Sequence, residues 1–178
     1  MEATADMTST VAQTPASSPG RTPSGLLSRR DLEFLLYEWL DIESVTRRPR
    51  FADCSRETFD AVLELAQDLA EKEFATHLKE SDRNEPHLTD GQVQVIPQIG
   101  RALKVAADSG LIGAAMNAEV GGMQLPATIA GACLAWLQAG NIATSAYLAL
   151  TTAAANLLTV YGTADQIDRW VRPMVEGR

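Results

Sequence analysis

The chain has 178 residues, a length that fits one domain, and its 46% hydrophobic and 21% charged residues are ordinary for a globular protein. The net charge of −8 at pH 7 argues against nucleic acid as a partner, because phosphate binding needs clustered Lys and Arg. The basic run Arg47-Arg48-Pro49-Arg50 is the exception. We interpret it as a solvated loop between helices rather than an anion-binding patch.

The cysteines and histidines indicate no metal site. Cys54 and Cys133 form no Cys-x-x-Cys pair, and Cys133 lies in an apolar run that is typical of a small core residue. His77 and His87 lie in polar surroundings without a second ligand type at metal spacing, so we expect no zinc. This cysteine usage is typical of the reducing cytoplasm, which is the predicted location.

Residues 1–25 are rich in Ser, Thr, Ala and Pro. They cannot bury enough apolar surface to offset the entropy of ordering, so they are predicted to form a disordered tail. No apolar segment follows a basic start, which argues against a secretory signal, and the early acidic residues Glu2 and Asp6 argue against a transit peptide. No run of about 18 apolar residues occurs, which excludes an ordinary membrane-spanning helix.

The first half of the remaining chain has helical periodicity. Residues 31–45 place apolar side chains at spacings of three and four, which predicts one amphipathic helix before Pro49. Ser55 is a plausible N-cap for a second helix that runs to about Leu78, with Glu57 in its first turn.

The middle of the chain is less regular. Asp90-Gly91 is a turn signal, and the alternation of residues 92–95 predicts a very short strand or extended arm. Pro97 can begin a helix that Gly110 ends. Gly121-Gly122 predicts a tight turn that permits positive φ, and it is not a phosphate loop because no Lys-Ser or Lys-Thr follows.

Two weakly polar helices are predicted next, over residues 126–139 and 143–161. A helix that is apolar on most sides is either buried or lines a ligand, and burial in the core is the favoured interpretation. Thr163 and Gln166 then form a capping-box pattern that begins a last helix. The predicted fold class is therefore all-α, a bundle of about five or six helices behind the tail.

No catalytic constellation is present in the sequence. It contains no Gly-x-Ser-x-Gly elbow, Walker loop, Gly-x-Gly-x-x-Gly or His-Glu-x-x-His. The carboxylates of Glu64, Asp68 and Glu71 share one helix face and are interpreted as a solvated surface rather than a paired acid and base. Residue chemistry alone therefore names no activity.

Several segments in order resemble the acyl-CoA dehydrogenase family, specifically its N-terminal helical domain. The nearest subgroup is the bacterial 3-methylmercaptopropionyl-CoA dehydrogenase type. Each motif alone is common, and their order and spacing together carry the resemblance. They are residues 31–38 (DLEFLLYE), Phe51-Ala52-Asp53, residues 107–112 (ADSGLI), residues 119–122 (EVGG) with Leu125-Pro126, and residues 161–166 (YGTADQ).

The resemblance implies α,β-dehydrogenation of an acyl-CoA thioester, in which a glutamate removes the α-proton and FAD accepts the β-hydride. It implies that residues 26–178 form the helical domain that helps to wall the acyl-chain pocket. The β-domain and the C-terminal helical domain, which supply the base and the main flavin contacts, are expected to be absent from this chain. No catalytic residue and no cofactor-binding residue is therefore assigned.

The chain also departs from the subgroup's pattern. Val120 stands where an aromatic residue is usual, Gly122-Met123-Gln124 stands where Gly-Gln-Gly is common, and Thr151-Thr152-Ala153 replaces a Thr-His-Gly phrase. These departures indicate relaxed constraint or a divergent pocket. Thr151 and Thr152, with Tyr147 one turn earlier, are the candidate pocket-lining residues.

Two hypotheses from different classes follow. The first is an N-terminal piece of an acyl-CoA dehydrogenase, separated from the rest by a frameshift, gene splitting or a gene-model error and inactive by itself. Its partners would be the missing flavin-binding domains. The second is a stand-alone helical interaction module that keeps the fold without the redox chemistry, as a monomer or a homo-oligomer.

Overall fold

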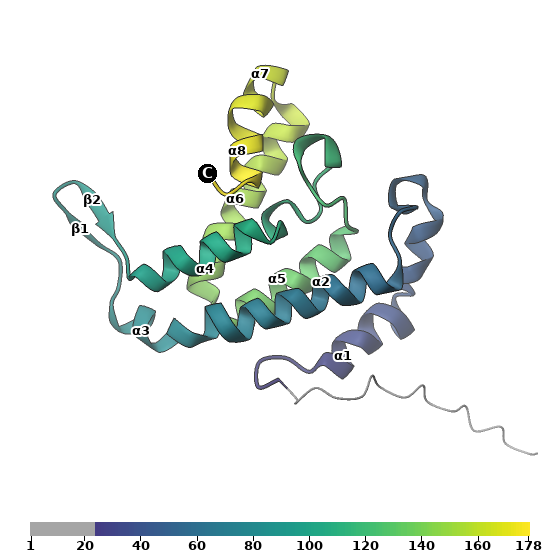
Figure 1. Cartoon of the computed structure of the whole chain (residues 1–178), viewed down its shortest axis with the longest axis horizontal. Helices are drawn as coiled ribbons and strands as arrows, with labels where there is room; N and C mark the ends of the chain where they lie inside the picture. The colour runs from purple at the N-terminus through teal and green to yellow at the C-terminus, as the bar shows by residue number, and fades with distance from the viewer. Residues whose placement is uncertain (1–23) are drawn as a thin grey trace, which may run out of the picture.

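The computed structural model describes residues 24–178, and these form helices with a single two-stranded hairpin (Figure 1). The predicted all-α fold is therefore confirmed. The predicted tail over residues 1–25 falls almost entirely on residues 1–23, which lie outside the described part of the chain.

The N-terminal segment is broken where the sequence predicts one helix. α1 spans Arg29–Glu33 and continues as a π-helical turn, η1, over Phe34–Trp39. Asp41 then adopts a left-handed φ of 46°, and a 3-10 helix, η2, follows over Ile42–Arg47. Aspartate tolerates the left-handed region better than most residues, so the chain can reverse here and the amphipathic pattern does not extend as one helix. A further 3-10 turn, η3, spans Pro49–Phe51.

The second helix begins as predicted. The Ser55 hydroxyl accepts a hydrogen bond from the Thr58 N–H at 3.3 Å and caps α2, which spans Arg56–Leu69. The helical path continues without a break through the π-helical turn η4 (Ala70–Phe74) and the 3-10 turn η5 (Ala75–His77). It ends with α3 over Leu78–Arg83.

The predicted short arm is a β-hairpin. β1 (His87–Thr89) pairs antiparallel with β2 (Gln92–Gln94), with Leu88 opposite Val93. Asp90 and Gly91 have φ of 50° and 77°, the positive sign at both positions that a type I′ hairpin turn requires. The arm projects from the helical body between α3 and α4 (Figure 1).

α4 spans Pro97–Asp108, with Pro97 in its first turn as predicted. Two 3-10 turns follow, η6 over Leu111–Gly113 and η7 over Ala118–Val120. The paired glycines come directly after η7. A Cβ on Gly122 would lie 2.3 Å from the carbonyl oxygen of Met116, so this turn closes only around a glycine.

Two longer helices complete the body. α5 spans Ala127–Gly140 and α6 spans Ile142–Tyr161, close to the predicted bounds. α5 contacts α2 and η4 along its length, and Gly140 lies so near η4 that a Cβ there would be 2.7 Å from the Ala70 carbonyl oxygen. The main core lies between these elements, and its largest fully buried side chains are Trp136, Phe59, Phe74 and Ile129.

α6 is much less buried than the sequence analysis favours. Only 22% of its most apolar 18-residue window is buried, and Leu150, Leu157 and Val160 are 71%, 60% and 69% exposed. Among the described residues, α6 is the one helix long and apolar enough to cross a membrane, a property that the core helices of soluble proteins share. The sequence argument against a membrane-spanning helix considered only unbroken apolar runs, and it therefore did not cover α6, whose apolar residues are interrupted by threonines.

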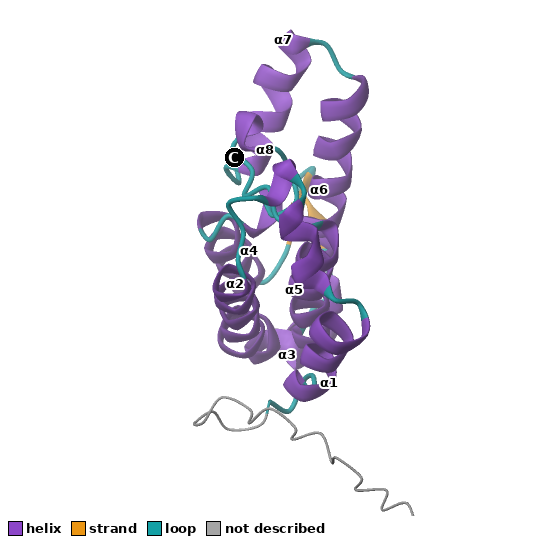
Figure 2. Cartoon of the chain, turned by 90° about the vertical axis from the view of Figure 1, so that its right-hand side faces the viewer, coloured by secondary structure: helices purple, strands orange, loops and turns teal. Residues whose placement is uncertain are grey.

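The C-terminal segment packs against the second half of α6 (Figure 2). It contains α7 (Ala164–Gln166), the π-helical turn η8 (Ile167–Val171) and α8 (Arg172–Val175). The predicted capping box is confirmed, because Thr163 Oγ1 accepts from the Gln166 N–H at 3.3 Å and Gln166 Oε1 accepts from the Thr163 N–H at 2.9 Å. A second, smaller buried cluster holds this segment, made of Met116, Val120, Ala155, Val171 and Val175.

Candidate functional site

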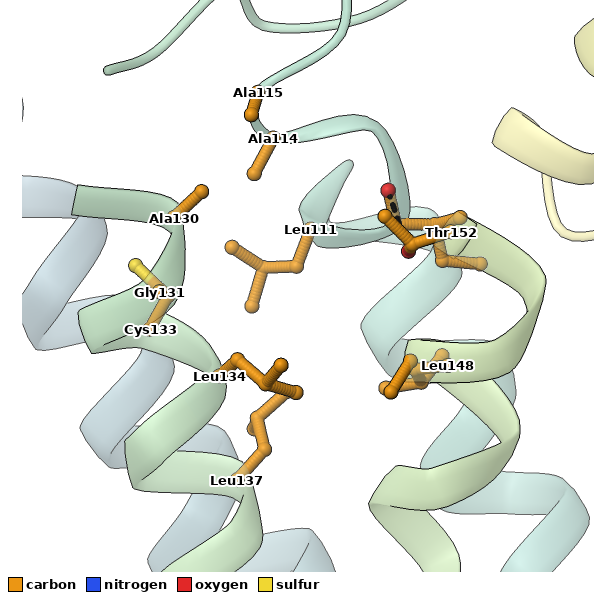
Figure 3. Close-up of a pocket in the computed structure, with 12 residues that line it drawn as sticks. Leu111, Ala114, Ala115, Ala130, Gly131, Cys133, Leu134, Leu137, Leu148 and Thr152 are labelled. Carbon is orange, nitrogen blue, oxygen red and sulfur yellow. Dashed lines mark hydrogen bonds between the residues drawn. The ribbon is translucent and has the colours of Figure 1, made fainter. Parts of the chain in front are cut away.

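An apolar cavity of about 210 Å³ lies between α5, α6 and the turn η6 (Figure 3). Leu111 points from η6 into the gap, Leu134 and Leu137 face it from α5, and Leu148 faces it from α6. Every lining residue is uncharged, and all but one are apolar. They are Leu111, Ile112, Ala114, Ala115, Ala130, Gly131, Cys133, Leu134, Leu137, Leu148, Ala149 and Thr152.

Small residues open this cavity. Alanines line it from the η6 side and from both helices, so the two helices stand apart there without long side chains to fill the space. Gly131 lies on α5 at this surface, and a Cβ built on it meets nothing within 4 Å. A glycine inside a helix costs about 1 kcal/mol relative to alanine. Gly131 therefore lowers the stability of α5, and it does so at a position where a larger side chain would have space.

The hydroxyl of Thr152, the one polar residue of the lining, and the thiol of Cys133 both have hydrogen-bond partners. Thr152 Oγ1 donates a hydrogen bond to the Ile112 carbonyl oxygen at 3.0 Å, which ties α6 to η6. Cys133 Sγ donates to the Val62 carbonyl oxygen at 3.8 Å. Burial raises the pKa of the Cys133 thiol to about 12, so it stays protonated at neutral pH and is a poor nucleophile.

The cavity can therefore bind apolar groups and cannot carry out acid–base or nucleophilic chemistry with its own side chains. An apolar cavity of 150 Å³ is large enough for benzene. A cavity of about 210 Å³ lined in this way has room for a short hydrocarbon chain.

The three candidate residues from the sequence are only partly brought together. Thr152 lies in the cavity lining. Thr151 donates its hydroxyl to the carbonyl oxygen of Tyr147 at 2.8 Å, a bond within its own helix, and neither of these two residues lines the cavity. Whether any of the three contacts a substrate stays a prediction.

Most of the cavity lining was missed by sequence reasoning. The missed residues come from α5, which the sequence analysis favours as core, from η6 with the two alanines that follow it, and from Leu148 and Ala149 of α6. One signal was available, because Gly131 interrupts a predicted helix without ending it. A mid-helix glycine indicates either close backbone approach or open space, and the structure shows open space.

A buried histidine forms the other polar cluster of interest. His77 is 2% exposed, with Nδ1 2.9 Å from the Glu73 carbonyl oxygen and Nε2 2.9 Å from the hydroxyl of Thr144. A carbonyl only accepts, so Nδ1 carries the proton and Nε2 accepts from Thr144. Nearby, Asn141 caps α6 by accepting from the Thr144 N–H at 3.1 Å.

Both nitrogens of His77 are thus engaged, and the cluster joins η5 to the start of α6. It has no free base and no second ligand for a metal. Among residues 24–178, no group of three or more His, Cys, Asp or Glu side chains is placed to hold a metal ion. The cluster's role is to fix the α5–α6 corner against η5.

Arginines in and near the basic run contact groups of this chain. Arg47 lies 3.8 Å from the Asp41 carboxylate, and Arg50 donates to the Ala115 carbonyl oxygen at 3.4 Å. Arg56, nearby in sequence, bonds to Glu43 at 3.2 Å and lies over the ring of Tyr37 at 4.0 Å. These arginines contact this chain's own groups on a surface.

Comparison with known proteins agrees with this architecture. The family model described as acyl-CoA dehydrogenase, N-terminal domain, matches residues 56–178. The chain belongs to the acyl-CoA dehydrogenase family, and the matched part is its N-terminal helical domain. A search of curated proteins finds no match. The family resemblance is therefore confirmed, and the subgroup stays a prediction.

Proposed function

We propose that this chain is the N-terminal portion of an FAD-dependent acyl-CoA dehydrogenase and that its helical domain comprises residues 26–178. The family match over residues 56–178 carries this proposal. The reaction of the whole enzyme would be α,β-dehydrogenation of an acyl-CoA thioester. The bacterial 3-methylmercaptopropionyl-CoA dehydrogenase type remains the proposed subgroup on the order of the sequence motifs, and the cytoplasm the proposed location.

The part that this chain would play is to hold the apolar end of the acyl group. The uncharged lining and the satisfied hydroxyl of Thr152 support this role, because a hydrocarbon chain needs water excluded and no polar group left unpaired. Tyr147 and Thr151, which are the sequence neighbours of the lining residues Leu148 and Thr152, would contact the same substrate from the adjoining side of α6.

The described residues do not fit FAD. The cavity of about 210 Å³ is smaller than the roughly 300–1,000 Å³ that drug-sized ligands occupy, and FAD is larger still. Its lining also has no charged group for a diphosphate. We therefore derive no step through the flavin, and we propose that the chain is inactive without the domains that hold it.

Ligand binding tests the acyl role directly. Titration of the chain with acyl-CoA thioesters of increasing length, followed by calorimetry, should show binding that coenzyme A alone does not show. Gly131→Leu should weaken it tenfold or more, about 1.4 kcal/mol, because the new side chain enters the free space. Gly100→Leu is the matched control: Gly100 is also a helical glycine with nothing within 4 Å, but it lies away from the cavity.

Equal binding of coenzyme A with and without the acyl chain would contradict the role of the cavity. The same conclusion would follow if Gly131→Leu and Gly100→Leu bound alike. The domain proposal has its own test, which is the DNA beyond the Arg178 codon. A reading frame there for the family's flavin-binding domain would support it, and an immediate in-frame stop with no such reading frame would count against it.

The second candidate function is a helical interaction module without redox activity. The exposed apolar face of α6 favours it, because such a face in a water-facing position marks a contact surface. Stoichiometric flavin that co-purifies with the chain would contradict this alternative.

A further inference from the structure

Residues 111–116, the turn η6 and the residues directly after it, form a wall with two different sides. Ile112 and Ala114 line the cavity. Gly113, between them, contacts the C-terminal segment instead, because a Cβ built on it would lie 2.8 Å from Cγ1 of Val175. α8, which contains Val175, lies beside η6 (Figure 1). One stretch of backbone therefore separates the cavity from the C-terminal segment, residues 164–178.

Glycine and a hydrogen bond keep this contact close. Gly121, in the loop that follows the wall, also faces Val175, with 3.6 Å between Cγ1 of the valine and a Cβ built on the glycine. Arg172 of α8 donates a hydrogen bond to the carbonyl oxygen of Glu119 at 2.7 Å. Closely packed interiors transmit strain. Neither the wall nor α8 can therefore shift far without moving the other.

The same loop supplies much of the buried anchor of the C-terminal segment. Val171 and Val175 belong to the smaller buried cluster, whose other members are Met116 of the wall, Val120 of the loop and Ala155 of α6. Two of these three partners thus belong to the wall or to the loop that continues it. The local stability of such a small unit depends on its few buried contacts. It therefore depends on the position of the wall.

An empty cavity leaves the wall free to move inward. The apolar space of about 210 Å³ lies directly behind Ile112 and Ala114. Groups around a core cavity relax partly into it, because the atoms that line it have lost contacts on that side. Inward movement takes the wall away from Val175. An apolar occupant fills the space and removes this freedom.

We propose that occupancy of the cavity and docking of the C-terminal segment stabilise each other through the wall. This inference rests on the proposed function, because it takes the apolar acyl end as the occupant. A filled acyl site would then go with an ordered C-terminal segment, and an empty site with a looser one. Coupling of this kind is reciprocal, so loosening the segment weakens binding in the cavity by the same factor.

The first test uses a side chain as the occupant. Gly131→Leu should slow amide hydrogen exchange at least threefold at Glu176 and Gly177, whose N–H groups donate to carbonyl oxygens of α8. Gly100→Leu controls for helix propensity, because it replaces another helical glycine with nothing within 4 Å that does not line the cavity. Equal exchange at these two amides in the two variants would overturn the coupling.

The second test measures the reverse effect, with benzene as a probe that needs only an apolar cavity. Val175→Ala removes atoms that contact Gly113 and should weaken benzene binding threefold or more. Val62→Ala is the matched control: Val62 is 4% exposed, against 6% for Val175, but it belongs to the main cluster and does not line the cavity. Equal affinities of the two variants would refute the link, and so would a wild-type chain that binds no benzene.

Hexanoyl-CoA separates this proposal from the acyl role of the cavity. If hexanoyl-CoA binds through its acyl chain and leaves exchange at Glu176 and Gly177 unchanged, the coupling is overturned and the acyl role stands. If benzene slows that exchange while hexanoyl-CoA does not bind, the coupling stands and the acyl role fails. Exchange in α2 and α5 is the internal reference, because those helices belong to the main cluster.

Discussion

Replacement of Thr144 by valine should destabilise the domain through His77. Valine keeps the volume of threonine and removes only the hydroxyl, and Thr144 and His77 are 0% and 2% exposed. The Nε2 atom of His77, which now accepts at 2.9 Å, would be buried without a partner. An unsatisfied buried polar atom costs about 1–3 kcal/mol. For a domain of this size, that corresponds to a fall in the melting temperature of roughly 2–12 °C.

Denaturant unfolding followed by circular dichroism measures this free energy, with Thr144→Ser as the control that keeps the hydroxyl and loses one methyl group. The double variant His77→Leu with Thr144→Val removes both partners, so its loss should be smaller than the sum of the two single losses. If Thr144→Val unfolds within about 0.5 kcal/mol of the wild type, or if the two losses simply add, the bond to His77 is not a stabilising contact.

Three further outcomes are expected. Gly122→Ala should lower the free energy of unfolding by more than 1 kcal/mol, because its Cβ would meet a carbonyl oxygen at 2.3 Å; unchanged denaturation would contradict this. Burial and the hydrogen bond to Asp60 raise the pKa of Tyr37, so an absorbance titration should show this tyrosine ionising above the ordinary tyrosine value of 10. The resulting stability is complete below pH 10, the ordinary tyrosine value, and is lost as the pH rises further, and Tyr37→Phe should remove that dependence. At pH 8 Cys54, which is partly exposed, should react with a thiol reagent before the buried Cys133, and equal rates would refute the placement.

Local signals were predicted well because they depend on a few adjacent residues. The turn at Asp90-Gly91 needs positive φ at both positions, and the cap at Ser55 needs one hydroxyl beside a helix start. Thr163 and Gln166 bond to each other as their spacing of three predicts. Each of these patterns has one favoured geometry, so the rest of the chain does not need to be known.

Features that depend on distant segments were not predicted. The amphipathic pattern before Pro49 is real, yet the chain reverses at Asp41 and leaves Trp39 69% exposed. The polar neighbours of His77 in sequence gave no sign of its burial, because its partner Thr144 lies 67 positions away. Composition also cannot separate α5 from α6: both are apolar, but α5 is enclosed by its neighbours while α6 has them on one side only.

The two buried clusters give the domain two regions of different resistance to opening. The main cluster joins α2, η4, α4 and α5, whereas the smaller one consists of Met116, Val120, Ala155, Val171 and Val175. α6 takes part in both, through Leu148 in the first and Ala155 in the second. Local unfolding follows such cooperative units. Amide hydrogens of η8 and α8 should therefore exchange with solvent while those of α2 and α5 remain protected.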